Sequence, residues 1–529
     1  MEFAGADEGR VDKPADDDGA RTSSCSIRAR LKTALETARQ NDAPPGSVKG
    51  IALKHHLALN LRKLGGDELH FHPRSYVLQK GNGFHEEYEH FVADFKVFQA
   101  IAVLKNLAAP REPSAAETSS TEARVAMPAA TIAPEGLWGR HLVELQWHPG
   151  PDPTLEVDGR CAAAASAVLQ RAVQIWQRGG CICCDGICVT DEEWAEIRHF
   201  SPEAPRSCDP SLVSIAVEAA EILRTVPFAR QFTLLRRNLW ALKPSCGQFG
   251  RGVLLMDRLP ASPEQLLQWA AGVGRGGRKG ANDEREGCVL QKVVEAPHLL
   301  DLQALAELRE SCDGPDETDS DSDAVERARD MKSPSRQGRL SQLTSGLFKY
   351  NLRIWVLVSL GSPAGAWLYK GGYVSLASHP FSPEPDPLSH ITNLRQGDSA
   401  PFQRRWSVDA FAACLRRQLR LDAFSEQILP QVRAIVRDMF RGLGAAPSGL
   451  ATKESTRLRR FGLDILVDAD LTAWLIEANI LKDGYAVGYA PKGAAGEDKR
   501  RLVRQLQEAE IQLRKAVRAG AGVVEDAFE

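Results

Sequence analysis

The chain has 529 residues, of which 43% are hydrophobic, and this is enough apolar material for one large or several smaller packed domains. Its 66 Lys and Arg residues nearly balance 69 Asp and Glu residues, so the composition argues against a basic protein that coats nucleic acid. The early residues are polar and acidic, and no apolar run reaches about 18 residues, so we expect neither a signal peptide nor a membrane span. The odd set of 11 cysteines has no regular framework, which indicates reduced thiols and a cytoplasmic protein.

Shifts in composition divide the chain into segments. The predicted order is an acidic disordered N-terminus at 1–24, an N-terminal globular region at 25–107, an Ala/Pro/Ser-rich linker at 108–136, a helical region at 137–229, a catalytic core at 230–495 and a charged C-terminal helix at 496–529. The core contains a polar insertion at 310–342, which we expect to be a mobile loop.

Hydrophobic periodicity predicts the elements within these segments. Apolar residues at three- and four-residue spacing predict a helix over 86–104, and weaker helical patterns occupy 162–177, 191–198, 211–229, 263–271, 408–419 and 498–517. Short runs rich in Leu, Val, Ile and Trp predict strands over 240–243, 252–256, 288–294, 352–360, 367–376, 461–467 and 473–479. Strands interleaved with helices indicate an α/β or α+β catalytic domain.

A glycine-rich segment with two basic side chains follows the first of these core strands. Lys243 precedes Gly247, Gly250, Arg251 and Gly252, and the next residues are strand-like. Glycines allow backbone amides to approach a polyphosphate closely, while Lys and Arg add positive charge. Because no helix follows, a glycine-rich hairpin over phosphates fits better than a P-loop; an ordinary β-hairpin is the competing interpretation.

Two late strands carry a set of oxygen donors. Glu477 and Asn479 are two residues apart and therefore share one face of a strand. A hairpin symmetric about Asp470 and Leu471 would place Asp464 directly opposite Glu477. Two opposed carboxylates among apolar residues repel each other unless a cation lies between them, which favours Mg²⁺ shared with phosphate. An exposed hairpin with solvated acids is the alternative.

Arg353 stands near the start of another apolar strand. An arginine there could hold a phosphoryl or carboxylate group through two parallel hydrogen bonds, or it could be an ordinary arginine of an edge strand. Four cysteines between positions 181 and 188 suggest a zinc site. Their spacing is cramped and no second Cys or His pair follows at a zinc-finger distance, so free thiols are the simpler interpretation.

Taken in order, five motifs resemble the tubulin tyrosine ligase-like family of ATP-grasp amino-acid ligases. They are Asn-Leu-Trp-Ala-Leu-Lys243-Pro with its glycine segment, Val-Leu-Gln291-Lys292-Val-Val-Glu, Lys-Tyr-Asn-Leu-Arg353-Ile-Trp, His390-Ile-Thr-Asn393, and Phe-Gly-Leu-Asp464 with Leu-Ile-Glu477-Ala-Asn479. The resemblance covers about residues 230–490, and segments 71–78 and 189–194 are similar to the glycine-adding branch of the family. It implies an ATP-grasp fold with an N-terminal helical and mixed extension.

The resemblance also implies a role for each motif residue. Lys243 with Gly247, Gly250, Arg251 and Gly252 would hold ATP phosphates; Gln291 and Lys292 would line the adenine pocket; Arg353 would face the transferred phosphoryl group near His390 and Asn393; and Asp464, Glu477 and Asn479 would carry Mg²⁺. Three features depart from the family pattern: Asn351 stands where an Asp is common, Ser375 where an Arg is common, and Ile-Leu-Lys-Asp follows Asn479.

The implied reaction joins free glycine to glutamate side chains in the acidic C-terminal tails of tubulin, through an acyl phosphate formed with ATP. Glutamate or tyrosine as the incoming amino acid, and an inactive nucleotide- and microtubule-binding module, are the alternatives. We expect a monomer in the cytoplasm on the cytoskeleton, with the axoneme of a cilium or flagellum as a candidate location. Basic residues that could approach the tails are Arg404, Arg405, Arg416, Arg417, Arg420, Arg457, Arg459 and Arg460.

Overall fold

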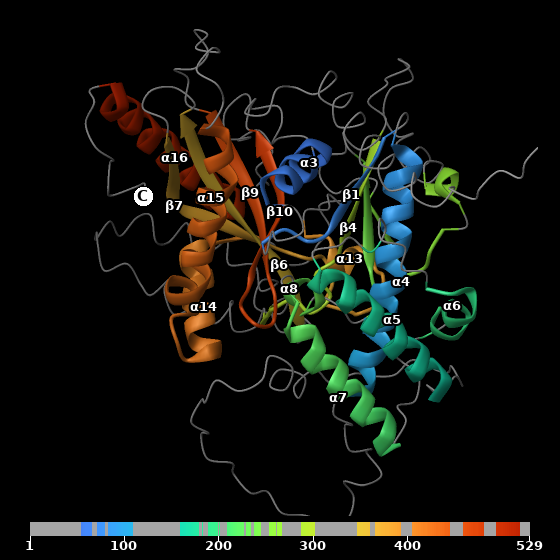
Figure 1. Cartoon of the computed structure of the whole chain (residues 1–529). Helices are drawn as coiled ribbons and strands as arrows, with labels where there is room; N and C mark the ends of the chain where they lie inside the picture. Colours follow the sequence, from blue (N-terminus) through green and yellow to red (C-terminus); the bar gives the residue numbers. More distant parts are fainter. Residues whose placement is uncertain are drawn as a thin grey trace, which may run out of the picture. The chain divides into compact units, whose positions relative to one another are not determined.

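Figure 1 shows a computed structural model of the chain. The structure describes residues 54–65, 71–79, 83–108, 159–178, 182, 189–198, 200, 209–226, 229–233, 237–244, 253–260, 262–266, 287–301, 346–359, 365–392, 405–444, 459–480 and 494–518. The predictions for the acidic N-terminus, the linker, the polar insertion and the four clustered cysteines concern residues outside these ranges. Within them, every helix is too short or too polar to cross a bilayer.

A small antiparallel sheet combines strands from distant parts of the sequence. Its strand order is β1-β4-β2-β3, with bounds Ser75–Gln79 for β1, Trp240–Pro244 for β2, Leu254–Met256 for β3 and Gly287–Lys292 for β4. The early strand β1 pairs with β4, so that Ser75 lies opposite Gln291. The N-terminal region therefore contributes an edge strand to the same sheet as the core segments.

Helix α4 (Phe84–Ala108) packs against β1 of the small sheet and lies alongside it in Figure 1. Helices α5 (Gly159–Gln177), α6 (Asp191–Ile197) and α7 (Pro210–Arg224) pack against α4, and α8 (Ala229–Thr233) packs against α7. The core between them is aromatic: Trp240 of β2 lies 5.1 Å from Phe91 of α4, centroid to centroid. The helix predicted over 211–229 ends early, at Arg224, because the sequence places Pro227 two residues after Thr225, and a proline disfavours helix in the residue before it.

A larger antiparallel sheet forms the second layer of strands. Its order is β10-β9-β6-β7-β8, with β5 pairing on β6; the bounds are Leu299–Asp301 for β5, Leu347–Ser359 for β6, Gly365–Leu376 for β7, Arg405–Ser407 for β8, Arg459–Val467 for β9 and Ala473–Ile480 for β10. The strands predicted for the core agree with the observed strands to within a few residues, and the predicted mixed α+β class is confirmed.

Helices pack on both faces of the larger sheet. One face holds α14 (Val408–Leu419), the π-helical turn η3 (Phe424–Ile428) and α15 (Leu429–Gly444), which enclose the largest apolar cluster of this sheet together with Leu57 and Leu61 of α3 (Lys54–Gly65). On the other face, α16 (Ala494–Arg518) places Leu506 and Leu513 against Trp355 and Tyr369. A short helix, α13 (Pro387–His390), lies in the segment after β7.

The hairpin between β9 and β10 is irregular in a way that matters for the site. Ala473 pairs with Val467 and Leu475 with Ile465, but Glu477 pairs with Asp464, so one extra residue, Ile476, is accommodated as a β-bulge. The turn is held by the buried Asp468, whose carboxylate accepts hydrogen bonds from the backbone N–H groups of residues 470 and 472 and from the Trp474 indole.

Candidate active site

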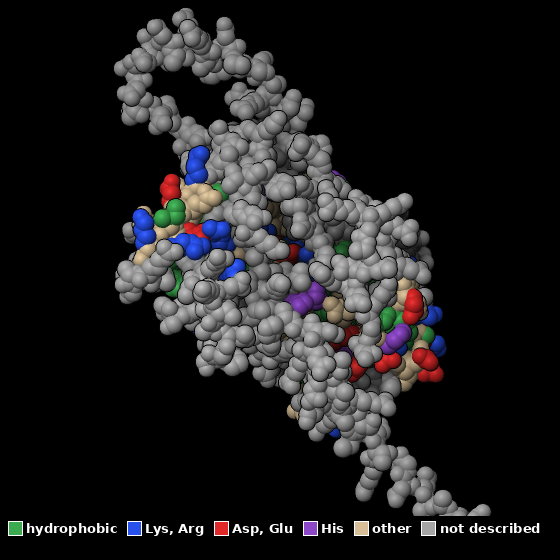
Figure 2. Space-filling view, turned by 90° about the horizontal axis from the view of Figure 1, so that it is seen from above, with side chains coloured by type: hydrophobic (Ala, Val, Ile, Leu, Met, Phe, Trp, Pro, Cys, Tyr) green, Lys and Arg blue, Asp and Glu red, His purple; other side chains and the backbone are tan. Residues whose placement is uncertain are grey.

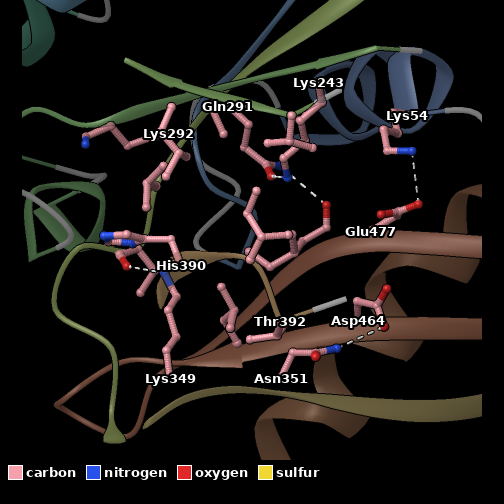
Figure 3. A pocket seen from close by; sticks show the side chains of 18 of the residues that line it. Lys54, Lys243, Gln291, Lys292, Lys349, Asn351, His390, Thr392, Asp464 and Glu477 are labelled. Carbon is pink, nitrogen blue, oxygen red and sulfur yellow. Dashed lines mark hydrogen bonds and ion pairs between the residues drawn. The ribbon is translucent and has the colours of Figure 1, made fainter. Parts of the chain in front are cut away.

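The two sheets face each other across an open cavity (Figure 3). The small sheet contributes Ala241, Val253, Leu255 and Val293 to its walls, and the large sheet and adjoining segments contribute Val294, Leu466 and Ile476. These apolar residues come from both sides of the cavity. A flat aromatic ring is the kind of ligand that such a pair of apolar walls accommodates.

Four lysines line the same cavity: Lys54, Lys243, Lys292 and Lys349. Burial lowers the pKa of Lys243 to about 8 and that of Lys349 to about 7. The Lys349 ammonium donates a hydrogen bond of 2.9 Å to the Val294 carbonyl. Among the described residues, the acids that line the cavity with them are Asp464 and Glu477, so its interior is suited to a highly charged anion.

Lys292 is the most constrained of the four lysines. Its ammonium donates to the Leu239 carbonyl at 2.6 Å and to the carboxylate of Glu295, which also accepts the Leu239 N–H at 2.6 Å. Glu295 is buried, and burial lowers the pKa of Lys292. The pair is therefore a neutralised link between the end of β4 and the start of β2, and Lys243 and Lys349 carry more of the charge directed at a ligand.

Asp464 and Glu477 lie directly opposite each other on β9 and β10, as the sequence predicted. The turn itself centres on Asp470, so the strand register beside the turn differs by one residue from that of the predicted symmetric hairpin. The bulge at Ile476 restores the expected pairing of Glu477 with Asp464. Without the bulge Glu477 would lie opposite Leu463 and point to the other face of the sheet, because strand side chains alternate. Figure 3 shows both carboxylates on the cavity side.

Donors surround the Asp464 carboxylate. Arg353 binds it through two hydrogen bonds, of 2.6 Å from Nε and 2.9 Å from Nη2, and the amides of Asn351 and Asn479 donate at 3.1 and 3.3 Å. Burial raises the pKa of Asp464, and the Arg353 guanidinium opposes that shift. Glu477 instead forms an ion pair with Lys54 at 3.2 Å.

The donor chemistry fits a hard divalent cation. Asp464, Glu477 and Asn479 supply oxygen atoms from adjacent strands, which is the ligand type that Mg²⁺ takes in phosphate-binding enzymes. Among the described residues there is no cluster of three or more His, Cys, Asp or Glu side chains, so the protein donors here are the two carboxylates and the amide oxygens of Asn479 and Asn351. Such a set leaves coordination positions for phosphate oxygens and water.

His390 brings the segment after β7 to the cavity. Its Nε2–H donates to the Glu384 carbonyl at 2.9 Å, and burial lowers its pKa to about 3, so the ring is neutral. Its Nδ1 atom is buried and receives no hydrogen bond from any residue that the structure describes. A neutral ring with a bare nitrogen is an acceptor for a ligand N–H or O–H group.

The structure brings some of the predicted site residues together at the cavity. Lys243, Gln291, Lys292, His390, Asp464 and Glu477 line the cavity. Arg353 and Asn479 contact Asp464 from beside it. Gly247, Gly250, Arg251, Gly252 and Asn393 lie outside the described residues.

Sequence reasoning assigned no role to Lys54, Lys349 or Glu295. Lys349 and Glu295 stood inside quoted motifs, and their place in the motifs of Arg353 and Gln291 is the signal that could have identified them; the structure buries both. Lys54 offers no such signal, because it comes from α3 and meets Glu477 only through tertiary packing.

Comparison with known proteins adds an independent observation. Residues 343–482, which span β6 to β10, match the family model described as the tubulin-tyrosine ligase family. The chain is 23% identical over 259 residues to the probable tubulin polyglutamylase TTLL9 of Bos taurus, covering 48% of this chain and 50% of that protein. It is 23% identical over 301 residues to the tubulin monoglycylase TTLL3 of Homo sapiens, covering 54% and 30%, respectively. The protein monoglycylase TTLL8 of Homo sapiens is 22% identical over 254 residues, covering 46% and 23%. The match therefore spans half or less of each relative.

Proposed function

We propose that this chain, a member of the tubulin tyrosine ligase-like family, is an ATP- and Mg²⁺-dependent ligase. The proposed reaction joins an amino acid to glutamate side chains of an acidic protein tail. The observation that carries the proposal is the cavity between the sheets, where buried lysines face an opposed pair of carboxylates. Apolar walls suit an adenine ring, the lysines suit a triphosphate, and the carboxylates suit the metal that accompanies it. The fold class expected for an ATP-grasp enzyme agrees with the two antiparallel sheets.

In the proposed reaction an acceptor carboxylate attacks the terminal phosphorus of ATP, and ADP leaves. The bound Mg²⁺ would neutralise charge on the phosphates, with Asp464, Glu477 and Asn479 as its protein ligands. Lys243 and Lys349 hold phosphate oxygens by charge and hydrogen bonding, which favours a transition state with more charge on those oxygens. The amine of the incoming amino acid then attacks the acyl carbon, and inorganic phosphate leaves. No step requires a nucleophilic side chain of the protein.

The acyl phosphate must be kept from water until the amine arrives. The apolar residues Val294, Leu466 and Ile476 near the carboxylates reduce the water that reaches this part of the cavity. Arg353 fixes the orientation of Asp464 through its two hydrogen bonds, so that the carboxylate needs little reorganisation on metal binding. These contacts support preorganisation as the main catalytic contribution of the chain.

Glycine is the incoming amino acid that we propose first, and glutamate is the second candidate. Two of the relatives are described as glycylases, and the segments at 71–78 and 189–194 resemble that branch. The similarity to a probable polyglutamylase, at the same identity, supports glutamate equally well. Tubulin is the proposed acceptor because the matched relatives are described as tubulin-modifying enzymes.

The acidic tails of such an acceptor would meet arginines at the edge of the larger sheet. Arg416, Arg417 and Arg420 are exposed at the end of α14, and Arg405 lies on the edge strand β8. Arg460 is less suitable, because its Nε donates to the buried Glu510 of α16 at 2.6 Å. Figure 2 shows Lys and Arg side chains, with some acidic ones, gathered on the side of the molecule where α16 lies in Figure 1.

The test is incorporation of labelled amino acids into purified tubulin with Mg-ATP. Glycine, glutamate and tyrosine are supplied in separate reactions, with tubulin that lacks its C-terminal tails as a control. We expect one amino acid to be incorporated, only into intact tubulin, and Glu477→Gln to abolish incorporation. Tubulin binding without incorporation of any of the three would reject the ligase in favour of a binding module.

The surface is tested separately by microtubule co-sedimentation at low salt. Arg416→Glu with Arg417→Glu should weaken association at least severalfold, because two charges on the approach surface are reversed. The matched control is Arg178→Glu with Arg224→Glu, which reverses the same number of exposed charges just after α5 and at the end of α7, away from the larger sheet. Equal losses in both double variants would remove the end of α14 from the proposal.

A further inference from the structure

The β-bulge at Ile476 decides which way Glu477 points, so whatever holds the bulge controls the metal carboxylate. β10 is the last strand in the order of the larger sheet, and no strand of the described part of the chain pairs with its outer edge in that sheet. A bulge on an edge strand is free to slide unless the backbone groups beside it are bonded. The residue immediately before the bulge is Leu475, which is fully buried.

Both backbone polar groups of Leu475 bond to the segment that precedes β1. The Leu475 N–H donates to the Phe71 carbonyl at 2.6 Å. The Leu475 carbonyl lies 2.7 Å from Nδ1 of His72, and since a carbonyl only accepts, that nitrogen carries the proton. Two adjacent residues from the N-terminal region thus occupy the outer edge of β10 at the point where its register changes.

The second nitrogen of His72 faces the nucleotide side. Burial lowers the pKa of His72 to about 4, so the ring is neutral and its Nε2 is an acceptor. Gln291 Nε2 lies 3.4 Å from this atom and 3.5 Å from the carbonyl of Ile476, the bulge residue. The side-chain carbonyl of Gln291 accepts a hydrogen bond from Lys243.

A continuous set of contacts therefore runs from the cavity to the bulge. It passes from Lys243 to Gln291, from Gln291 to His72, and from His72 to Leu475. Ser75 completes the arrangement: its hydroxyl donates to the Pro73 carbonyl at 2.8 Å and lies 3.3 Å from the Gln291 amide nitrogen. Each member is buried or lines the cavity, so water competes little for these bonds.

We propose that His72 is a positioning residue that fixes the bulge of β10 and thereby holds Glu477 opposite Asp464, linking occupancy of the nucleotide cavity to the geometry of the metal ligands. The inference rests on the proposed function for the role of Glu477. In its fixed tautomer His72 donates one hydrogen bond to the Leu475 carbonyl and accepts one from the Gln291 amide. These two bonds connect the small sheet to the large sheet at the bulge.

The variants separate the hydrogen bond from the volume of the ring. His72→Phe keeps a ring of similar size and removes both nitrogens, leaving the Leu475 carbonyl without this donor. His72→Asn places an amide N–H near the position of Nδ1 and should restore the bond to Leu475. Tyr350→Phe is the control, because it removes a different hydrogen bond in the same sheet, the 3.2 Å contact between the Tyr350 hydroxyl and His298.

The first readout is Mn²⁺ binding in the presence of ATP, measured by electron paramagnetic resonance without tubulin or amino acid. We expect His72→Phe to weaken Mn²⁺ binding about tenfold, the effect of leaving one buried acceptor unpaired. The Mn²⁺ affinity of His72→Asn should lie within about threefold of the wild-type affinity, and the Mn²⁺ affinity of Tyr350→Phe should equal that of the wild type. The second readout is amide hydrogen exchange of β10, which should accelerate at Leu475 and its neighbours in His72→Phe alone.

The loss of the His72 hydrogen bonds should change the Mg²⁺ requirement of the reaction without changing the KM for the amino acid. In His72→Phe the Mg²⁺ concentration for half-maximal rate should rise while the KM for the amino acid stays unchanged. Wild-type Mn²⁺ affinity and wild-type exchange at residues 475–477 in His72→Phe would overturn the inference and leave the proposed function intact. A wild-type chain that binds neither ATP nor Mn²⁺ would overturn the proposed function and this inference together.

Discussion

Replacing Asn351 with Asp tests the electrostatics of the site most directly. The Asn351 amide nitrogen lies 3.1 Å from a carboxylate oxygen of Asp464, and both side chains are buried. Asn351→Asp exchanges a hydrogen-bond donor for a second negative charge at that distance. It also restores the residue type that the tubulin tyrosine ligase-like pattern favours at this position.

The cost without metal can be worked from these positions. Two unit charges about 3 Å apart repel by roughly 5 kcal/mol at an effective dielectric constant of about 20. Arg353 already lies 2.6 Å from Asp464 and attracts the new carboxylate as well, which offsets part of the repulsion. We therefore expect a net loss of about 2 kcal/mol in the free energy of unfolding at neutral pH, or roughly 2 °C in Tm for a chain of this length.

The pH dependence follows from the sign of the pKa shift. Two close carboxylates raise the pKa of one of them above its unfolded value, so the folded pair holds a proton that the unfolded chain releases. The variant should therefore approach wild-type stability near the unfolded pKa, about 4, and lose stability as the pH rises through the raised value. A divalent cation held by Asp464 would reduce the penalty, because its positive charge would offset the repulsion between the two carboxylates.

The assay is thermal unfolding at pH 5 and pH 8, with and without 10 mM Mg²⁺, on Asn351→Asp and on Asn351→Leu. The leucine variant loses the donor to Asp464 without adding charge, and its Tm should respond little to Mg²⁺. The aspartate variant should be the less stable of the two at pH 8 and should recover with Mg²⁺. Equal Tm values for the two variants at pH 8, with no response to Mg²⁺, would refute the electrostatic reasoning and the assignment of a metal to this position.

Three further predictions concern the lysines, the C-terminal helix and the metal carboxylate. The pKa values of Lys349 and Lys243 are lowered to about 7 and 8, so both side chains lose their charge as the pH rises through these values. The Kd for ATP, measured by calorimetry, should therefore rise severalfold from pH 6.5 to pH 9. Lys349→Arg should make the Kd depend less on pH, because arginine stays charged over this range. Glu510→Gln leaves Arg460 and Arg514 facing a neutral amide, so the free energy of unfolding measured in urea should fall by about 2–4 kcal/mol. The control is Glu508→Gln on the exposed side of α16, which should leave the free energy of unfolding unchanged. Glu477→Gln should weaken Mn²⁺ binding at least tenfold, with a small fall in Tm from the lost ion pair with Lys54; equal Mn²⁺ affinity would remove Glu477 from the metal site.

Local periodicity accounts for the parts of the fold that were predicted correctly. Strands such as 461–467 and 473–479 are short apolar runs bounded by polar turns, and they appear as β9 and β10 within a residue or two. The helix α15 and the edge strand β8 were not predicted. The strand has only three residues and presents no strong local pattern. The helix does have one, because Val432, Ile435, Val436 and Met439 recur at three- and four-residue spacing and form its buried face, and that pattern could have identified it.

The sequence by itself determined that Glu477 and Asn479 would share one strand face, because the period of two is fixed by the backbone, whereas the pairing of Glu477 with Asp464 depends on the bulge at Ile476. It also identified Lys243, Gln291 and His390 as members of one site through the order of their motifs. Only the tertiary structure decided that Lys54 meets Glu477, that Arg353 is bound to Asp464, and that Phe71 and His72 hold the edge of β10. These contacts join residues far apart in the chain, and they depend on how two sheets and their helices pack, which no local pattern of side chains encodes.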